Sequence, residues 1–484
     1  MTDLLFSPSL NRRVFVRGLG YVSLGVILGT VGGCDLDKIL EAIANRPMRR
    51  RLRVGSPEVD ADIATYAQAV TLMKALGDGR SWNSQAAIHG TAGVGFKWCQ
   101  HGTAHFFDWH RAYLLYFERI CQKVTGNARF GLPYWNWNQN PDINPAFLNT
   151  ASSLFMARSH TSMAGQAATG SPTLNTIFAD TNFFTFWQQI EGTPHNTVHG
   201  YIGATMGGYG SAMDPIFWTH HCMIDYCWAK WNIDLGNDNT SDTTWLDHNN
   251  EHFVDADNNP ASMIAGLTPV LPLLSYQYES SPIGSAPATM AMTSKRAFQQ
   301  LERRIRAGAD IKFVVKERIA IAERAAITLA RPFSRVTTLA PGAVGRIVHS
   351  DTAQERLFAS VEFARLPRTS DYSVRVFVNL PGATRATPID DVHYAGSFAF
   401  FGTELPAEPN APPRTDHQQP RFLVNLTDTV QRLKRTQELK DDSALSVQLV
   451  AVPFADKFER EDTEIVLTRI EILITPVIVK SPQR

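Results

Sequence analysis

The chain has 484 residues, and its 46 Lys and Arg residues balance 46 Asp and Glu residues, so the formal net charge at pH 7 is zero. This neutrality argues against a basic nucleic-acid-binding surface, and a hydrophobic content of 44% argues against wholesale disorder. All ten tryptophans lie between Trp82 and Trp245, and nine of the fourteen histidines lie between His89 and His221. The composition therefore predicts a functional domain in the first half of the chain and a chemically plainer domain after it.

Residues 1–34 resemble an export signal. Arg12 and Arg13 precede an uncharged run over residues 18–33, which is shorter than the ~20 residues of a membrane span. The paired arginines resemble a twin-arginine signal, so we expect export to the periplasm or the cell envelope. The four residues that end at Cys34 resemble a lipoprotein cleavage box. The sequence leaves open whether Cys34 carries a lipid anchor or the leader is removed by ordinary signal cleavage.

Apolar residues recur at helical spacing through the first half of the chain. The predicted helices cover residues 60–76, 105–124, 183–200 and 214–232. Long loops rich in Gly, Pro, Asn and Ser separate them. We therefore expect a mainly α chain, with a helical-bundle domain over residues 55–280.

The second half begins with a segment rich in Pro, Ala and Ser, which a Lys- and Arg-rich stretch follows as far as residue 335. We interpret residues 281–335 as a linker and a basic helical connector with a solvated face. Short alternating runs then predict strands at residues 373–379, 421–425, 445–452 and 464–479. They predict a C-terminal β-sandwich over residues 336–484.

Two clusters of histidines point to a metal. His195 and His199 are four residues apart, which places both imidazoles on one face of a helix. Thr193 and Pro194 predict that this helix begins just before them, because Thr is a good cap and Pro suits the first turn.

Asp214 and Pro215 predict another helix start, before the adjacent pair His220 and His221. Neighbouring helical positions point about 100° apart, so only one of this pair can face the same metal. Four more histidines lie upstream: His89, His101, His105 and His110. The sequence has no Cys-pair zinc spacing and no His-Glu-x-x-His motif, and six imidazoles without a carboxylate ligand favour copper or zinc over a di-iron site.

The residues around these histidines resemble the two copper signatures of tyrosinases and catechol oxidases. The first signature is matched by His101, Phe106, Phe107, Trp109, His110, Arg111, Leu114 and Glu118. The second is matched by Asp214, Pro215, Phe217, Trp218, His221 and Asp225. The resemblance covers roughly residues 55–280 and implies a dinuclear type 3 centre of two copper ions, with O2 as co-substrate.

The resemblance also implies which histidines bind copper. His89, His101 and His110 correspond to the ligands of one copper ion, and His195, His199 and His221 to those of the other. His105 and His220 are left over. Cys99 corresponds to the cysteine that many members of the family join to the matching histidine, here His101, through a thioether. A free buried thiol is the alternative. Asp225 suits either an imidazole-orienting carboxylate or a salt-bridge partner.

The activity implied is that of a copper oxidoreductase, which hydroxylates monophenols at the ortho position and oxidises o-diphenols to o-quinones. Glu191 and Asn196 resemble the pair that holds a phenol-deprotonating water in this family, so monophenolase activity is expected. A catechol oxidase or an o-aminophenol oxidase without hydroxylase activity is the nearer alternative. A hemocyanin-like O2 carrier is the remote one.

Residues 372–379 and 394–398 resemble the C-terminal domain of plant polyphenol oxidases and, more distantly, the β-sandwich of molluscan hemocyanins. This resemblance implies a domain that covers the dicopper entrance and keeps the enzyme latent until it is removed. Many aromatic side chains are candidates for reaching the site, and Phe454 is one of them. The expected partners are small phenols and O2, with no nucleic acid. A protein that delivers copper is a further candidate partner.

Overall fold

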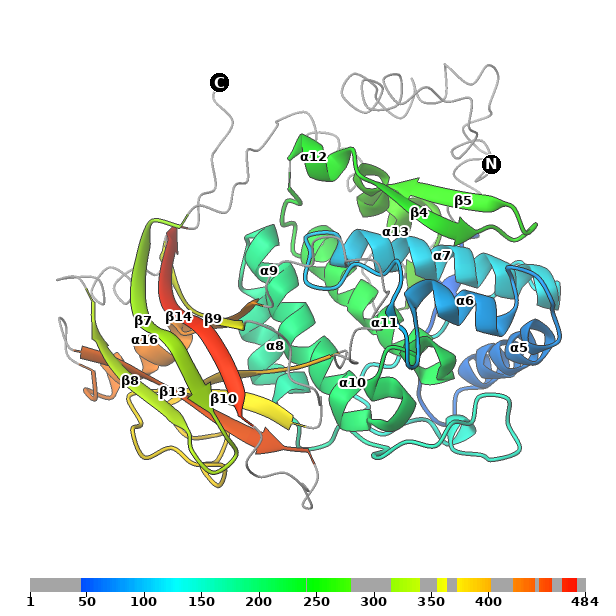
Figure 1. Cartoon of the computed structure of the whole chain (residues 1–484). Helices are drawn as coiled ribbons and strands as arrows, with labels where there is room; N and C mark the ends of the chain where they lie inside the picture. The colour runs from blue at the N-terminus through cyan, green and yellow to red at the C-terminus, as the bar shows by residue number, and fades with distance from the viewer. Residues whose placement is uncertain are drawn as a thin grey trace.

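The computed structural model describes residues 45–240, 242–279, 315–339, 355–363, 372–401, 421–439, 444–454 and 464–476 (Figure 1). The predicted export signal, with Cys34, lies outside these residues, as does the predicted linker over 281–293. In the described part of the chain, no helix is long and apolar enough to cross a membrane.

The first domain is built from helices joined by long loops, as predicted. Its helices are α5 (Pro57–Lys74), α6 (Trp82–His89), α7 (Phe106–Thr125), α8 (Ser171–Phe178), α9 (Phe183–Ile190), α10 (Asn196–Ile202), α11 (Pro215–Ala229), α12 (Thr243–Leu246) and α13 (Leu271–Leu274). Short strands join them: β1 (Met48–Arg49), β2 (Gly90–Thr91), β3 (Gly95–Phe96), β4 (Asn249–Val254), β5 (Pro260–Ile264) and β6 (Gln277–Tyr278). One large hydrophobic cluster, which includes nine of the ten tryptophans, fills this domain.

Local sequence signals explain several of the helix ends. Asp214 accepts a hydrogen bond from the backbone N–H of Ile216, and Pro215 occupies the first turn, so α11 begins where the sequence predicts. Helix α7 ends at Gly126, whose left-handed backbone (φ 70°) favours glycine.

The predicted helix start at Thr193 is wrong. Helix α9 continues through a π-helical turn, Glu191–His195, directly into α10. The backbone of Ile190 is already helical, so Thr193 caps nothing. Its hydroxyl instead donates a hydrogen bond of 2.8 Å to the carbonyl of Ser397, far along the chain. His195 and His199 therefore lie on one continuous helix that is widened by the π turn.

The start and the end of the first domain pack together. Strand β1 pairs in parallel with β6, so the domain begins before the predicted boundary at residue 55. Arg49 of β1 is fully buried and donates to Glu118 of α7 at 2.8 Å and to Asp225 of α11 at 3.1 Å. Arg111 forms a second ion pair with Asp225. Asp225 is thus a salt-bridge partner, the second of its two predicted roles.

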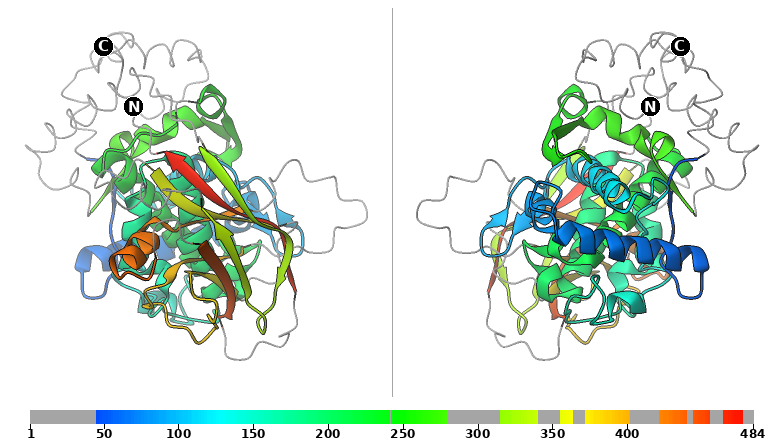
Figure 2. Two further views of the ribbon diagram at one scale, coloured as in Figure 1. Left: turned by 90° about the vertical axis from the view of Figure 1, so that its left-hand side faces the viewer. Right: turned by 90° about the vertical axis from the view of Figure 1, so that its right-hand side faces the viewer.

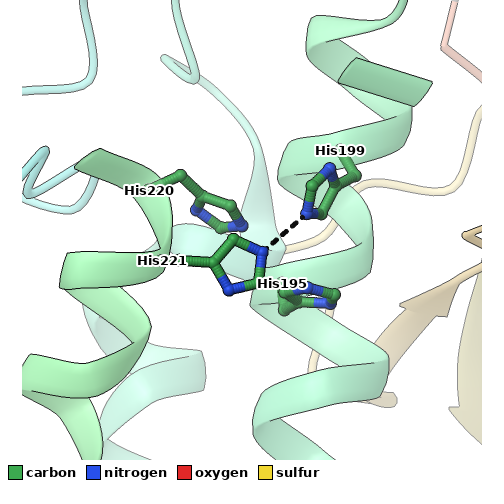
Figure 3. A group of neighbouring side chains, drawn as sticks. All are labelled: His195, His199, His220 and His221. Carbon is green, nitrogen blue, oxygen red and sulfur yellow. Dashed lines mark hydrogen bonds between the residues drawn. The ribbon is translucent and has the colours of Figure 1, made fainter. Parts of the chain in front are cut away.

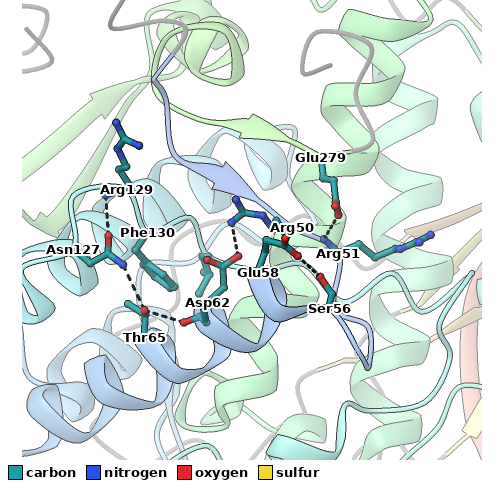
Figure 4. Close-up of polar contacts among 12 residues, drawn as sticks. Arg50, Arg51, Ser56, Glu58, Asp62, Thr65, Asn127, Arg129, Phe130 and Glu279 are labelled. Carbon is teal, nitrogen blue, oxygen red and sulfur yellow. Dashed lines mark hydrogen bonds and ion pairs between the residues drawn. The ribbon is translucent and has the colours of Figure 1, made fainter. Parts of the chain in front are cut away.

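A more exposed set of polar contacts ties the same chain start to α5 (Figure 4). Arg50 forms an ion pair with Asp62 at 2.8 Å, and the backbone N–H of Arg51 donates to Glu279 at 3.2 Å. The first contact holds the segment before α5 against α5 itself, and the second holds it against Glu279, which follows β6.

The second domain consists of two four-stranded antiparallel sheets. They contain β7 (Glu317–Ile327), β8 (Phe333–Thr338), β9 (Glu355–Phe363), β10 (Tyr372–Val378), β11 (Tyr394–Ala399), β12 (Arg421–Asn425), β13 (Ala444–Pro453) and β14 (Ile465–Pro476). The strand orders are β11-β10-β13-β8 and β12-β9-β14-β7. Side chains from both sheets, such as Val376 and Ile472, share one hydrophobic cluster, and helix α16 (Thr427–Arg435) packs onto it.

The predicted helical connector is wrong over residues 317–335. This segment forms β7 and β8, and β7 pairs with β14 as an edge strand. Its charged side chains are largely exposed, which is how edge strands commonly avoid pairing with other chains. The sheet domain therefore begins near residue 317, earlier than the predicted boundary at residue 336.

The sheets lie beside α8, α9 and α10 of the helical domain (Figures 1 and 2). The carbonyl of Ala399, at the end of β11, accepts a hydrogen bond of 2.9 Å from the Asn196 amide. Gly192 lies so close to Phe422 of β12 that a Cβ atom there would be 2.9 Å from the ring. The π turn therefore forms part of the interface between the two domains.

Candidate metal centre

Three histidines from three chain segments form the first cluster. His89 ends α6, His110 lies in the second turn of α7, and His101 lies in the loop between β3 and α7. One nitrogen from each lies within 4.8 Å of the others. His89 and His110 are buried, and His101 is partly buried. This arrangement brings together the first predicted ligand set.

Four buried histidines form the second cluster (Figure 3). His195 ends the π turn, His199 lies on α10, and His220 and His221 lie on α11. One nitrogen from each lies within 4.8 Å of the others. The Nε2 atoms of His199 and His221 are 3.2 Å apart, and the two helices face each other across the group.

The two clusters are in contact. The rings of His110 and His221 stack with centroids 4.4 Å apart, and those of His101 and His195 are 5.4 Å apart. Two metal ions, one in each cluster, would therefore be close neighbours.

Hydrogen bonds set the imidazole tautomers. The Nδ1 atoms of His110 and His199 lie 2.7 and 2.8 Å from the carbonyls of Phe106 and Met206. Since a carbonyl only accepts, each Nδ1 carries the proton and each Nε2 presents a lone pair. The Nε2 atoms of four ligand candidates are buried without a hydrogen-bond partner: His89, His101, His110 and His195. Buried, unpaired lone pairs that converge in this way suit metal ions.

Electrostatics keep these imidazoles neutral. Burial lowers the pKa of both His89 and His195 to about 3. Burial also lowers the pKa of His199 well below its usual value, and the neighbouring His195 adds to this effect. Neutral imidazole is the metal-binding form, so the ligands need not lose protons at pH 7.

The two histidines left over from the sequence comparison are engaged differently. The Nδ1 atom of His220 accepts a hydrogen bond of 3.2 Å from the Trp137 indole, so the neutral ring carries its proton on Nε2. This Nε2 is buried without a hydrogen-bond partner, but in that tautomer it has no lone pair for a metal. His105 lies outside both clusters, stacked on His248 with ring centroids 3.8 Å apart.

Comparison with known proteins agrees with this geometry. The profile of the common central domain of tyrosinase matches residues 79–165 and 149–234, which include all six predicted ligands. Residues 79–234 of the helical domain therefore match the central domain of the tyrosinase family. The centre is therefore a type 3 pair of copper ions, O2 fits as the co-substrate, and the family acts as copper oxidoreductases on phenols.

Whole-chain relatives include both tyrosinases and catechol oxidases. The tyrosinase HcTyr1 of Hahella sp. is 24% identical over 85% of this chain and 97% of its own. Catechol oxidase B of Solanum tuberosum is 26% identical over 88% of this chain and 77% of its own.

Two solved structures share the fold of both domains. A latent aurone synthase, a polyphenol oxidase, covers 90% of each chain with a TM-score of 0.64 at 20% identity. A functional unit of octopus hemocyanin covers 89% of this chain and 100% of its own with a TM-score of 0.52 at 16% identity.

The other predicted site residues lie beside the dicopper centre. Glu191 is buried, and its Oε1 accepts a hydrogen bond of 2.7 Å from the backbone N–H of Gly102, next to His101. Burial raises the pKa of Glu191 to about 8. Asn196 accepts from Nδ1 of His195 at 2.8 Å through its Oδ1. Glu191 and Asn196 therefore contact segments of both clusters.

Cys99 lies beside the ligand with which it is paired in the prediction. Its Sγ is 3.2 Å from Nδ1 of His101, and the side chain is buried. Burial raises the pKa of the Cys99 thiol well above its usual value. The position suits both a crosslinked and a free cysteine.

A side chain that the sequence analysis did not single out covers the centre. Phe401, which follows β11, stacks on His199 with ring centroids 3.9 Å apart and lies 5.1 and 5.5 Å from His101 and His195. It is only 4% exposed. Phe454, the candidate named from the sequence, packs instead on Tyr201 at 5.6 Å.

Proposed function

We propose that this protein is a tyrosinase with both monophenolase and diphenolase activity, and that its C-terminal domain holds it latent. The proposed ligands are His89, His101 and His110 for one copper ion and His195, His199 and His221 for the other. The observation that carries this assignment is the convergence of six buried or partly buried imidazoles, four of which have an Nε2 atom without a hydrogen-bond partner. When bound, the copper pair supplies the electrons and the Lewis acidity for reaction of O2 with a phenol.

In this proposal the residues of the chain handle the substrate proton. A phenol with a pKa near 10 must lose its proton before it can bind a metal as phenolate. Burial holds the pKa of Glu191 at about 8, which suits a group that accepts and returns a proton near neutral pH. Asn196 orients Nδ1 of His195 and, together with Glu191, would hold the water that relays this proton.

Replacing Glu191 tests this assignment. In the protein without its C-terminal domain, Glu191→Gln should lower monophenolase activity about 100-fold, as expected for a general base, and leave catechol oxidation nearly unchanged. Tyramine and catechol turnover, measured on the same preparation, give the ratio. An unchanged ratio would show that Glu191 is not the proton acceptor.

A catechol oxidase without hydroxylase activity is the second candidate. It is favoured by the amide of Asn196, which donates to Ala399 rather than being free to hold a water. If the protein freed of its C-terminal domain oxidises catechol but not tyramine, this candidate replaces the first. Reversible O2 binding without turnover of either phenol would favour a hemocyanin-like carrier.

We also propose a thioether between Cys99 Sγ and the imidazole of His101. The distance of 3.2 Å supports it, and the bond would fix the ring of a ligand. Its formation would remove the thiol hydrogen of Cys99 and one ring C–H hydrogen of His101, with O2 as the oxidant that is reduced to H2O2. Mass spectrometry of copper-loaded protein should therefore find one crosslinked peptide that is lighter by two hydrogens.

The C-terminal domain, which we propose is a β-sandwich, would act as the shield. Phe401 occupies the space above His199 that a phenol ring would need. Proteolysis within residues 281–293 should therefore raise activity. We further propose export through the signal at residues 1–34, with Cys34 as lipid anchor and a copper-delivering protein as partner. Fractionation of cells that express Cys34→Ala tests the anchor.

A further inference from the structure

His101 differs from the other five proposed ligands in the secondary structure that holds it. Those five lie on helices or on the π turn, whereas residues 97–105 form neither helix nor strand. Two backbone hydrogen bonds hold the beginning of this loop: Lys97 donates to the carbonyl of His89, and Trp98 donates to that of Ile88. The geometry of the first copper cluster therefore depends on what holds the rest of the loop.

A single eight-residue segment, Trp245–His252, contacts this loop at several points. The Trp245 indole donates a hydrogen bond of 2.8 Å to the carbonyl of Ala104. The ring of His248 stacks on that of His105 with centroids 3.8 Å apart and an interplanar angle of 23°. These two contacts hold the end of the loop, where it enters α7.

The same segment continues into β4, which holds the loop and the first turn of α7 together. Asp108 of α7 is buried, and its Oδ2 accepts from Nδ1 of His105 at 3.1 Å and from the Asn250 amide at 2.8 Å. His105 is thus fixed by a ring on one side and a carboxylate on the other. His105, which is in neither proposed ligand set, therefore has two defined contacts: the ring of His248 and the carboxylate of Asp108.

The last contact comes from a strained residue. His252 has a left-handed backbone (φ 72°), which non-glycine residues seldom adopt, and it lies where the pairing of β4 with β5 shifts register. The shift turns its ring onto Trp98, with centroids 3.6 Å apart and an interplanar angle of 16°. Trp98 precedes Cys99 and lies three residues before His101. Backbone strain of this kind persists only where the surrounding contacts hold the residue in place, and it is common near functional sites.

We propose that the Trp245–His252 segment positions His101, so that it sets the copper affinity of the first cluster without contacting copper. Trp98, His105, Trp245, His248 and His252 are positioning residues in this scheme. The inference rests on the proposed ligand assignment, because it takes His101 to be a ligand. It predicts that weakening the segment loosens the first copper ion and leaves the second in place.

His252→Gly is the informative substitution. Glycine relieves the left-handed backbone and removes the ring, so a merely structural role predicts a change in thermal stability with the affinity for both copper ions unchanged. A positioning role predicts a loss of affinity for one copper ion of about 10–100-fold, as is usual when the support of a metal ligand is removed. His252→Phe keeps a stacking ring but no imidazole, so it should retain copper.

The experiment uses full-length, copper-loaded protein equilibrated against increasing chelator. We expect the wild type to hold two copper ions per chain, with no EPR signal from the oxidised coupled pair. His252→Gly should pass through a form with one copper ion per chain and the EPR signal of isolated Cu(II), at chelator concentrations that leave the wild type and His252→Phe loaded.

The outcomes separate the two proposals. If His252→Gly loses both copper ions together, or holds both as tightly as the wild type, the positioning role is wrong. The same holds if His252→Phe behaves like His252→Gly, since the ring stack would then not be the cause. If the wild type itself fails to bind a coupled pair, the ligand assignment fails instead.

Discussion

Replacing Phe401 by Ala tests latency most directly, because one side chain joins the shield to the copper ligands. The ring packs face to face on His199 and also contacts Phe96 at a centroid distance of 5.2 Å, and the side chain is almost fully buried. Phe401→Ala should therefore open the space above the ligands and weaken the contact between the two domains at the same time.

The size of the effect follows from the burial of this ring. Truncating a buried Phe to Ala typically costs about 3–5 kcal/mol. If about 3 kcal/mol of this stabilised the closed arrangement, the fraction of open molecules would rise roughly 100-fold, since 1.4 kcal/mol is a factor of ten. The activity of the uncleaved chain toward catechol should rise by a similar factor, with the activity of the cleaved protein as its upper limit.

The assay compares catechol oxidation by uncleaved and protease-cleaved protein for three sequences. The wild type should be activated strongly by cleavage, and Phe401→Ala only weakly. Phe454→Ala is the matched control, because Phe454 packs on Tyr201 and does not contact the ligand histidines. It should behave like the wild type. If Phe401→Ala remains as inactive as the uncleaved wild type while cleavage activates both, the ring is not the block.

Three further predictions concern the interface, the core and the pH response. Thr193→Val removes a hydrogen bond to Ser397 worth about 0.5–1.5 kcal/mol, so uncleaved protein should gain roughly 2–10-fold in activity and cleaved protein none. Arg49→Met removes the ion-pair partner of the buried Glu118 and one of the two of Asp225, so urea unfolding of the helical domain should show a loss of about 3–5 kcal/mol. Burial raises the pKa of Glu191 from 4.5 to about 8, so the folded copper-free protein keeps a proton that the unfolded chain releases. Above about pH 6.5, where the buried histidines are neutral in the folded and the unfolded chain, its stability should therefore fall toward pH 8 in urea titrations, and Glu191→Gln should flatten this slope.

Much of the helical domain could be predicted because its signals are local. Asp214 and Pro215 begin α11 through a cap and a fixed backbone angle, both of which act within one turn. The ligand clusters could be predicted in outline for the same reason, since four-residue spacing on a helix fixes His195 and His199 relative to each other.

The parts that were missed depend on contacts between distant residues. Residues 317–327 carry enough charge to suggest a solvated helix, but pairing with β14, well over 100 residues later, makes them a strand. Phe401 could have been found from the alternation of β11. Phe398 and Phe400 face the core of the sheet domain, so the next residue points the other way, toward the helical domain.

The sequence analysis missed the π turn because proline usually marks the start of a helix. The π turn explains how one segment contacts both the copper clusters and the sheet domain. Pro194 has no N–H to donate within the helix, and the backbone N–H of Asn196 bonds to the carbonyl of Glu191, five residues back. This wider turn lets Glu191 and His195 face the copper clusters while Thr193 meets the sheet domain. The proposed shield therefore contacts residues next to Glu191, the proposed proton acceptor, and next to the proposed ligand His195, so release of the domain should alter proton transfer as well as access to the copper ions.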